Sequence, residues 1–495
     1  MPIMDEPTSL DPQIADSNSE KLVAANCYEG LVRIMADGTI GKGVATDWNI
    51  SDDGLTYTFK LRNNSHWAMF SGHKAVLGEN YEDTFDITVK AEDFKFGIER
   101  TLSEQTGSAD APLFSAVKSI STPDDFTIVF NLSYADDNFL YALTNPGAMP
   151  CDEEFFNLTN GKYGLDAKYL LCNGPFHVSK WTEKTSVKLV KNNEYNGESS
   201  VSPSSVTFYI NNNDSEVADK MNSVTYDVAF LSSSQFSSIE NKKDLNSVAV
   251  QNVTYSFIFN QNDNNYRNKN MRLAFCRSCD TSSLFDSQSD ISKADGIVPP
   301  SCKIGGEDYR NGNAAELLSY DETLAKKNFN DALLELGSSS VETTILCTEQ
   351  YESFVKQMVQ KLQKTLGVKF VSTVKVVSES DLEAAVNDGN YSVAFYPFKA
   401  KSSFAGEIIE GFDQNNIFGY ESDVLSQKIR NIKNNSGSLE GERSAVADAE
   451  NYLVSEAVIM PVFYENSYFV TSKKTSGIYF YSSADNVFFI NSKKS

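Results

Sequence analysis

The sequence is poor in histidine and has no long apolar run. Its 495 residues include only 3 histidines, and no stretch approaches the ~20 consecutive apolar residues that a membrane helix needs. The 43 basic residues are outnumbered by 67 acidic ones, which gives a net charge of −24. Nucleic acids require a basic patch, so this balance argues against a nucleic-acid partner. The start, Met1-Pro2-Ile3-Met4, lacks the charged and apolar regions of a signal peptide.

Motifs of the common enzyme classes are also missing. The chain contains no HExxH, GxSxG, P-loop or GxGxxG. His66 and His73 would need further ligands, such as Glu79 or Asp83, to hold a metal ion. Acidic pairs such as Asp124-Asp125 occur at predicted turns, where Asp bonds to its own backbone. The sequence therefore predicts a protein that is not an enzyme and has no cofactor or metal, although a hydrolase with scattered carboxylates is an alternative.

The cysteine count is odd, so at least one of the 7 cysteines has no partner within the chain. Cys276 and Cys279 have the spacing of a metal or redox motif, but there is no second CxxC and the segment has a helical pattern. We predict buried thiols there. Cys151 and Cys172 flank a segment of 20 residues and could be bridged in an oxidising compartment.

A turn and strand at residues 51–62 predict an antiparallel scaffold. Asp53-Gly54 supplies the turn, because glycine tolerates positive φ. After it, Leu55, Tyr57, Phe59 and Leu61 alternate with Thr56, Thr58, Lys60 and Arg62. This period of two predicts one buried and one solvated face.

The region after residue 340 has the pattern β-α-β-α-β. An apolar, β-branched segment at 341–347 precedes a helical pattern at 354–366, which Gly367 ends. A strand is expected at 368–377. Ser380-Asp-Leu-Glu383 has the form of a capping box and opens a helix before a strand at 391–396.

A similar alternation occurs earlier in the chain. We expect strands at 206–210, 226–231 and 248–253, with helices at 215–221 and 235–240. Two α/β lobes follow, each with a mainly parallel sheet and a ligand crevice beyond the carboxyl ends of its strands. Lobes of this kind that face each other form a cleft that closes by hinge motion.

The intervening region has an α+β character. A helix is predicted at 91–100 and a strand pair at 117–121 and 127–132. The predicted domains are lobe I (1–43, 173–258 and 466–495), an inserted α+β domain (44–172) and lobe II (259–465).

Several short motifs, in this order, resemble solute-binding protein family 5, the extracytoplasmic oligopeptide-binding receptors of ABC importers. The resemblance covers nearly the whole chain. Its motifs are Glu6-Pro-Thr-Ser-Leu-Asp11-Pro12, Tyr28-Glu-Gly-Leu31, Trp48 with the turn, Ala91-Glu-Asp-Phe94 with Arg100, Asn173-Gly-Pro-Phe176 with Trp181, Asn193 to Tyr195, Asn260 with Met271-Arg272, and Met460-Pro461-Val462.

The resemblance implies a type II periplasmic-binding-protein-like α/β fold, with two lobes around a ligand cleft and an inserted domain. It implies a short peptide ligand that pairs its backbone with the protein, an ABC transporter permease as partner, and a monomer. It also implies an extracytoplasmic, cell-surface lipoprotein or periplasmic protein of a bacterium, whose signal peptide and lipid-anchored cysteine would lie upstream of Met1. The residues expected at the ligand are Tyr28, Glu29, Gly30, Leu31, Asn173, Ala394, Phe395, Tyr396, Phe398, Phe404 and Tyr464.

The chain departs from the family pattern at Pro397. Peptide binders of this kind commonly place an Asp there, which accepts the ligand's N-terminal ammonium. A substitute could come from Glu407, Glu410 or Asp413, or the ligand is not held by its N-terminus. Aromatic residues nearby could instead stack on apolar or sugar surfaces. An oligosaccharide or a metal chelate is therefore the alternative ligand.

Overall fold

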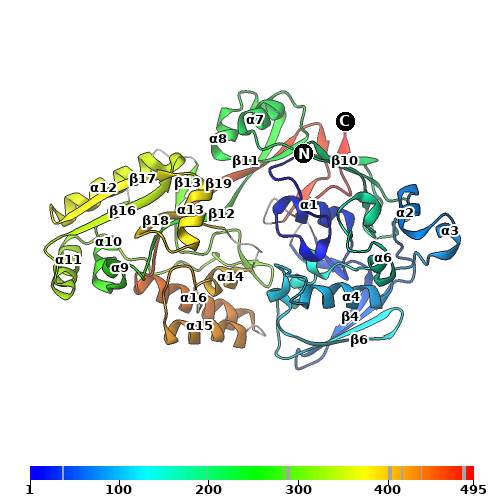
Figure 1. Ribbon diagram of the computed structural model, residues 1–495, viewed down its shortest axis with the longest axis horizontal. Helices are drawn as coiled ribbons and strands as arrows, with labels where there is room; N and C mark the ends of the chain where they lie inside the picture. Colours follow the sequence, from blue (N-terminus) through cyan, green and yellow to red (C-terminus); the bar gives the residue numbers. More distant parts are fainter. Residues whose placement is uncertain are drawn as a thin grey trace. The chain divides into compact units, whose positions relative to one another are not determined.

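The computed structural model describes residues 1–35, 38–197, 199–281, 284–285, 290–399, 404–413, 416–435, 438–481 and 486–495 (Figure 1). The chain divides into two compact units. Unit 1 consists of residues 1–250 and 468–495, and unit 2 of residues 251–467. The chain crosses between them in two long strands, β12 (Leu245–Phe259) and β19 (Ile459–Ser472).

Unit 1 contains two four-stranded sheets. The first has the order β1 (Pro2–Ile3), β10 (Ser205–Ile210), β9 (Ser186–Lys191) and β8 (Phe176–Thr182). The second has the order β4 (Ala45–Ile50), β5 (Thr56–Leu61), β7 (Thr127–Leu132) and β6 (Val117–Asp124). Its helix α4 (Ala91–Leu102) and the predicted β6–β7 strand pair are confirmed.

The predicted hairpin at 51–62 is confirmed, with one correction. Gly54 has φ of 69°, and Tyr57, Phe59 and Leu61 are buried. Arg62, predicted on the solvated face, lies after the end of β5, and its side chain is only 12% exposed because it forms an ion pair.

The prediction that residues 206–210 and 226–231 share one parallel sheet is wrong. β10 pairs antiparallel with β9, whereas β11 (Val228–Ser232) is the neighbour of β19 in another sheet. Helix α7 (Asp214–Asn222), between them, therefore joins two sheets. Strand–helix alternation alone does not determine which strands become neighbours.

Unit 2 is built on a mixed sheet with the order β19, β12, β18 (Val393–Lys399), β16 (Val341–Thr348) and β17 (Phe370–Val377). β16 is parallel to both β17 and β18, and β18 is antiparallel to β12. Helix α12 (Glu352–Leu366) packs along β17 through its buried apolar residues, such as Val355 and Met358, and ends at Gly367 with φ of 78° (Figure 1).

The predicted capping box at Ser380 is wrong by two residues. Helix α13 (Glu379–Asn387) begins after Ser378, whose side chain accepts a hydrogen bond from Asp381 N. Ser378 and Ser380 carry the same side chain, and only the end of β17 decides which of them caps the helix.

The other elements of unit 1 are η1 (Pro12–Ile14), α1 (Asn18–Cys27), β2 (Val32–Ile34), β3 (Ile40–Lys42), η2 (Ser71–His73), α2 (Lys74–Leu77), α3 (Tyr81–Thr84), η3 (Ala111–Phe114), α5 (Phe139–Ala142), η4 (Pro146–Ala148), α6 (Glu153–Leu158), η5 (Ala167–Tyr169), α8 (Ser233–Ser238), η6 (Lys242–Asp244), β20 (Thr475–Ser476), β21 (Tyr479–Phe480), β22 (Val487–Phe488) and β23 (Lys493–Lys494). Those of unit 2 are α9 (Asn264–Arg267), α10 (Lys269–Arg277), β13 (Ile291–Lys293), β14 (Lys303–Ile304), β15 (Glu307–Asp308), α11 (Glu322–Leu336), η8 (Glu349–Tyr351), α14 (Ala405–Glu410), α15 (Asp423–Asn434) and α16 (Leu439–Ser455). Within the ranges given above, no helix combines the length and apolar character that a membrane crossing requires.

Candidate functional site

Residues 28–31, called the strap here, connect α1 to β2 in unit 1. Helix α1 begins with a capping box between Ser17 and Glu20 and ends at Cys27. Tyr28 then takes an extended conformation, with φ of −120° and ψ of 156°. The capped helix therefore fixes the point at which the strap leaves it.

The backbone of Glu29 is held by the side chain of Asn173. Glu29 N donates to Asn173 Oδ1 at 3.0 Å, and Asn173 Nδ2 donates to Glu29 O at 2.9 Å. Asn173 is 1% exposed, so the pair of bonds is shielded from water. Both main-chain groups of Glu29 are thus occupied within the protein.

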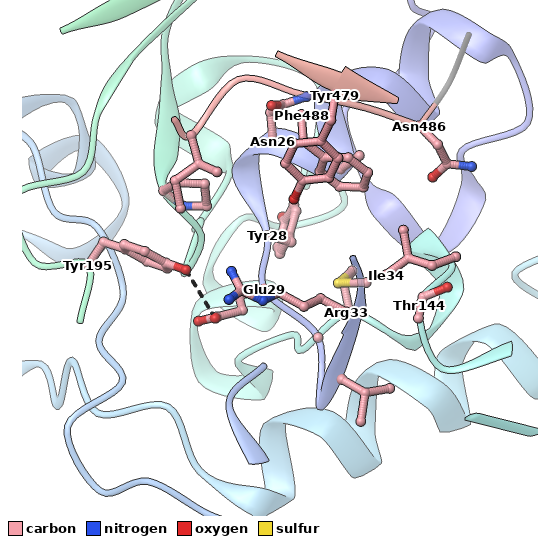
Figure 2. A pocket seen from close by; sticks show the side chains of 16 residues that line it. Asn26, Tyr28, Glu29, Arg33, Ile34, Thr144, Tyr195, Tyr479, Asn486 and Phe488 are labelled. Carbon is pink, nitrogen blue, oxygen red and sulfur yellow. Dashed lines mark hydrogen bonds between the residues drawn. The ribbon is translucent and has the colours of Figure 1, made fainter. Parts of the chain in front are cut away.

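The carboxylate of Glu29 is also fully engaged. Its Oε2 forms an ion pair with Arg62, which follows β5, and Arg62 Nη1 also donates to Gly43 O at 2.5 Å. Its Oε1 accepts from the Tyr195 hydroxyl at 3.0 Å, the dashed line in Figure 2. The side chain is 4% exposed, so Glu29 orders the strap and its charge is balanced.

The remaining strap residues are packed closely. Tyr28 is 4% exposed and its hydroxyl lies 3.3 Å from that of Tyr163, while Leu31 is 0% exposed. Gly30 O accepts from Val44 N at 2.9 Å. In the part of the chain that the structure describes, no acceptor pairs with the N–H of Gly30. This buried donor is available to a ligand or to water, because an unpaired buried N–H is costly.

A small cavity lies against the strap (Figure 2). It encloses about 60 Å³ and is lined by residues of unit 1 alone, among them Tyr28, Glu29 and Gly30. A volume of this size holds a few water-sized groups. It therefore has room for a small chemical group of a ligand beside the strap.

Sequence reasoning missed several residues that line this cavity. Arg33, Tyr195, Tyr479 and Phe488 contribute side chains from distant parts of the chain (Figure 2). Burial, followed by the charge of Glu29, raises the pKa of Tyr195. Tyr195 belongs to a motif that marked the family, but no local pattern links it to residue 29.

In unit 2, strand β18 is paired along its whole length on one side only. On one side, β12 pairs with all of Val393–Lys399. On the other side, β16 pairs only with Val393 and Ala394. Among the described residues, no strand continues this second side beyond Ala394. The unpaired side of residues 395–399 is called the free edge below.

Pro397 lies at a position of β18 where its missing N–H removes no hydrogen bond to β12. Asn260 N donates to Ser392 O at 3.0 Å, so these two residues form a hydrogen-bonded pair. Hydrogen-bonded and non-hydrogen-bonded pairs alternate from there along β12 and β18. Counting from this pair, Tyr396 and Phe398 occupy hydrogen-bonded positions, and Pro397 occupies a non-hydrogen-bonded one opposite Tyr255. Pro397 therefore directs its C=O toward the free edge and offers no N–H there.

Most of the predicted side chains near β18 belong to packed aromatic clusters. Ala394 and Phe395 are buried, and Phe395 packs against Phe257 and Phe463. Half-buried Phe398 packs near Tyr396 and stacks on Phe412. Phe404 is half-buried and precedes α14.

Tyr464 is also buried in unit 2. It is 2% exposed and its hydroxyl accepts from Asp295 N at 3.1 Å. It thus lies in the interior of this unit, and its place at the ligand stays a prediction.

A half-buried acid, Glu465 of β19, lies beside the residues that follow β16. Glu465 accepts hydrogen bonds from the Tyr351 hydroxyl and from Gln350 Nε2. Its pKa is raised by burial and by the neighbouring charges of Glu379 and Asp290. The same rise in pKa could not be inferred from sequence, because these acids meet only in the folded sheet.

The sequence-based expectations on cysteine and histidine have clear outcomes. All 7 cysteines are free and buried, as predicted for Cys276 and Cys279. The possible Cys151–Cys172 bridge is absent. His73 is 1% exposed and its Nε2 lies 3.1 Å from Leu170 O, inside the core. Within the described residues, no group of three or more His, Cys, Asp or Glu side chains could hold a metal ion.

Comparison with known proteins agrees with this architecture. The family described as bacterial extracellular solute-binding proteins, family 5 Middle, matches residues 39–418. The dipeptide-binding protein DppE of Bacillus subtilis (strain 168) is 24% identical over 496 residues, which cover 96% of this chain and 88% of DppE.

Solved structures share the fold. The dipeptide binding protein from Pseudoalteromonas sp. SM9913 in complex with Met-Leu has a TM-score of 0.78 at 18% identity, covering 100% of this chain and 99% of its own. Listeria monocytogenes OppA bound to peptide has a TM-score of 0.76 at 21% identity, covering 100% and 98%. Because the family match extends over residues 39–418, well over half of the chain, this protein belongs to the family 5 bacterial extracellular solute-binding proteins.

Proposed function

We propose that this protein is an extracytoplasmic receptor that binds short peptides and delivers them to the permease of an ABC importer. The observation that carries the proposal is the free edge of β18, a row of backbone groups with which no strand pairs among the described residues, toward the carboxyl end of the strand. The relatives described as dipeptide-binding and peptide-bound support the ligand class.

The binding mode that follows is β-augmentation. A peptide laid along the free edge would donate an N–H to the C=O of Pro397. In unit 1, the N–H of Gly30 offers a donor to a carbonyl oxygen. Backbone pairing tolerates different side chains. We propose that lobe I, the inserted domain and lobe II, with the boundaries predicted from sequence, close around the ligand.

The acceptor for the peptide's ammonium is part of the same proposal. Pro397 supplies no carboxylate, so either a neighbouring acid accepts the ammonium or the ligand is not held by its N-terminus. Glu407, Glu410 and Asp413 are the residues expected from sequence, and Glu465 is a further acid beside the residues that follow β16. A receptor without such an acid would bind N-acetylated and free peptides equally well.

The decisive experiment is a thermal-shift screen. Peptide pools of two to about ten residues should raise the Tm, because a ligand that binds only the native state stabilises it. A glycan panel and nickel chelates represent the alternative ligands. No shift with any peptide, together with a shift from a glycan or a chelate, would overturn the peptide assignment. Turnover of a bound compound would support the hydrolase alternative.

A second experiment tests the binding mode. For one peptide that binds, each backbone N–H is replaced by N-methyl in turn. Methylation at the residue opposite Pro397 should weaken binding at least tenfold, since that residue's N–H is the donor to Pro397 C=O. Matched methylation of an outward-facing N–H is the control. Equal effects at all positions would exclude strand pairing.

The cellular context also belongs to the proposal. We expect an ABC transporter permease as partner, a monomeric receptor, and attachment to the membrane only through a lipid anchor. Size-exclusion chromatography with light scattering would test the monomer. Pull-down with the permease co-expressed in membranes would test the partnership.

A further inference from the structure

Two buried cysteines adjoin the strap and its partner Asn173 in unit 1. Cys27 is the last residue of α1, and Cys172 directly precedes Asn173, which holds Glu29. Their exposed fractions are 0% and 1%. Burial, followed by the neighbouring Cys172 thiol, raises the pKa of the Cys27 thiol. Two cysteines that are 145 residues apart in sequence are thus neighbours in space.

Main-chain contacts hold these neighbours in place. Gly174 N donates to Cys27 O at 2.9 Å, and Ala68 N donates to Cys172 O at 2.7 Å. A Cβ atom at Gly174 would lie 2.6 Å from Tyr28 N, so the two segments touch backbone to backbone. Disulfides require adjacent segments of this kind, because the Cα atoms they join lie only about 4.4–6.8 Å apart.

The third cysteine of this region has other partners. Cys151 Sγ lies 3.5 Å from Arg100 Nη1, and Arg100 is held by an ion pair with Asp11 at 2.6 Å. The remaining four cysteines, Cys276, Cys279, Cys302 and Cys347, belong to unit 2. Cys27 is therefore the partner that the fold assigns to Cys172.

We propose that Cys27 and Cys172 are a disulfide site, and that oxidation during folding fastens the strap covalently to the Asn173 segment. The oxidant is a small-molecule or protein disulfide. One thiolate attacks it and forms a mixed disulfide, releasing one thiol. The second thiolate displaces the other half of the oxidant. The protein loses two protons and two electrons, and the oxidant is reduced to two thiols.

Burial decides when this bond forms. The thiolate is the reactive species, and burial raises the pKa of the Cys27 thiol. Once folded and reduced, the pair reacts slowly with oxidants and alkylating agents. Oxidation therefore takes place while the chain folds, before both cysteines are buried.

The test is oxidative refolding followed by peptide mapping. Full-length reduced protein is unfolded and refolded with glutathione and glutathione disulfide, then unfolded again with N-ethylmaleimide. We expect one Cys27–Cys172 cross-linked peptide and alkylation of the other five cysteines. Cys27→Ala and Cys172→Ala should abolish the cross-link, and Cys151→Ala should leave it unchanged. A Cys151–Cys172 peptide, or seven alkylated cysteines, would overturn the proposal.

A second readout does not depend on whether the variants fold. Oxidised and reduced wild-type protein are compared without ligand, and the oxidised form should have a Tm several degrees higher, because the cross-link restricts the unfolded chain. Equal Tm values with the cross-link present would contradict the fastening role. Since neither readout involves a ligand, failure here is distinct from failure of the peptide proposal.

Discussion

The strap in unit 1 and the free edge in unit 2 are the two backbone segments that we assign to the ligand, and they differ in how the fold holds them. In the strap, the main chain and carboxylate of Glu29 are satisfied by Asn173, Arg62 and Tyr195, which leaves one N–H at Gly30. In β18, no strand among the described residues pairs with the side beyond Ala394. A pre-ordered segment and an open strand edge are the two stretches of backbone that we assign to the ligand. The first depends on distant side chains, whereas the second depends on strand register.

The largest expected effect is the loss of stability when the ion pair of the strap is removed. Arg62→Ala should destabilise unit 1 by about 3–5 kcal/mol, because it leaves the Glu29 carboxylate buried without a cation. Chemical denaturation followed by tryptophan fluorescence measures this, since Trp48, Trp67 and Trp181 all lie in unit 1. Lys74→Ala, also in unit 1, is the control. It breaks an exposed pair with Glu79 and should cost less than about 1 kcal/mol. Similar losses in both variants would refute a structural role for Glu29.

Lowering the pH should destabilise unit 1 through His73 but should not have this effect on unit 2. Burial lowers the pKa of His73 from 6.5 to about 4. As the pH falls through this interval, the unfolded chain takes up a proton that the folded protein does not, so stability of unit 1 falls by about 3 kcal/mol. In His73→Gln this part of the slope should vanish. Unit 2 contains no histidine, and hydrogen exchange in it should lack this transition. An equal loss of stability in both units over this pH interval would contradict the assignment to His73.

The Asn173 contact gives a smaller effect. Asn173→Ala removes two hydrogen bonds from the Glu29 backbone and should cost about 2 kcal/mol in unfolding free energy. Asn157→Ala, at an exposed position of α6, is the matched control and should change stability by about 0.5 kcal/mol or less. If peptide binding uses the strap, Asn173→Ala should also lower affinity. Unchanged affinity would place the ligand elsewhere.

The smallest effect concerns the free edge. Pro397→Ala should change the stability of unit 2 by less than about 1 kcal/mol, because Pro397 makes no bond to β12. Tyr396→Pro, one residue earlier, is the opposing variant. It removes an N–H that pairs with β12 and should be destabilising by about 3 kcal/mol or more. Equal effects in the two variants would show that the alternation of pairs counted from Asn260 is wrong.

Features that are specified by residues close together in the sequence were predictable, and features that depend on distant residues were not. The hairpin at 51–62, the helix ending at Gly367 and the strand at 341–347 were predictable, because local periodicity and turn residues specify them. The position of the α13 cap, the sheet membership of β10 and β11, and the buried state of Arg62 were not. Each depends on a neighbour that is remote in sequence.

The same division applies to the candidate site. The sequence by itself determined the family scaffold. Its assignment of the ligand to segments 28–31 and 391–399, and of Pro397 to the place of an expected acid, stays a prediction. Only the tertiary structure decided that Glu29 is paired with Arg62, that no described strand pairs with the side of β18 that Pro397 faces, and that Gly174, two residues after Cys172, bonds to Cys27. Helices and turns arise from contacts over a few residues, whereas ion pairs, strand register and thiol proximity arise when the chain brings distant residues together.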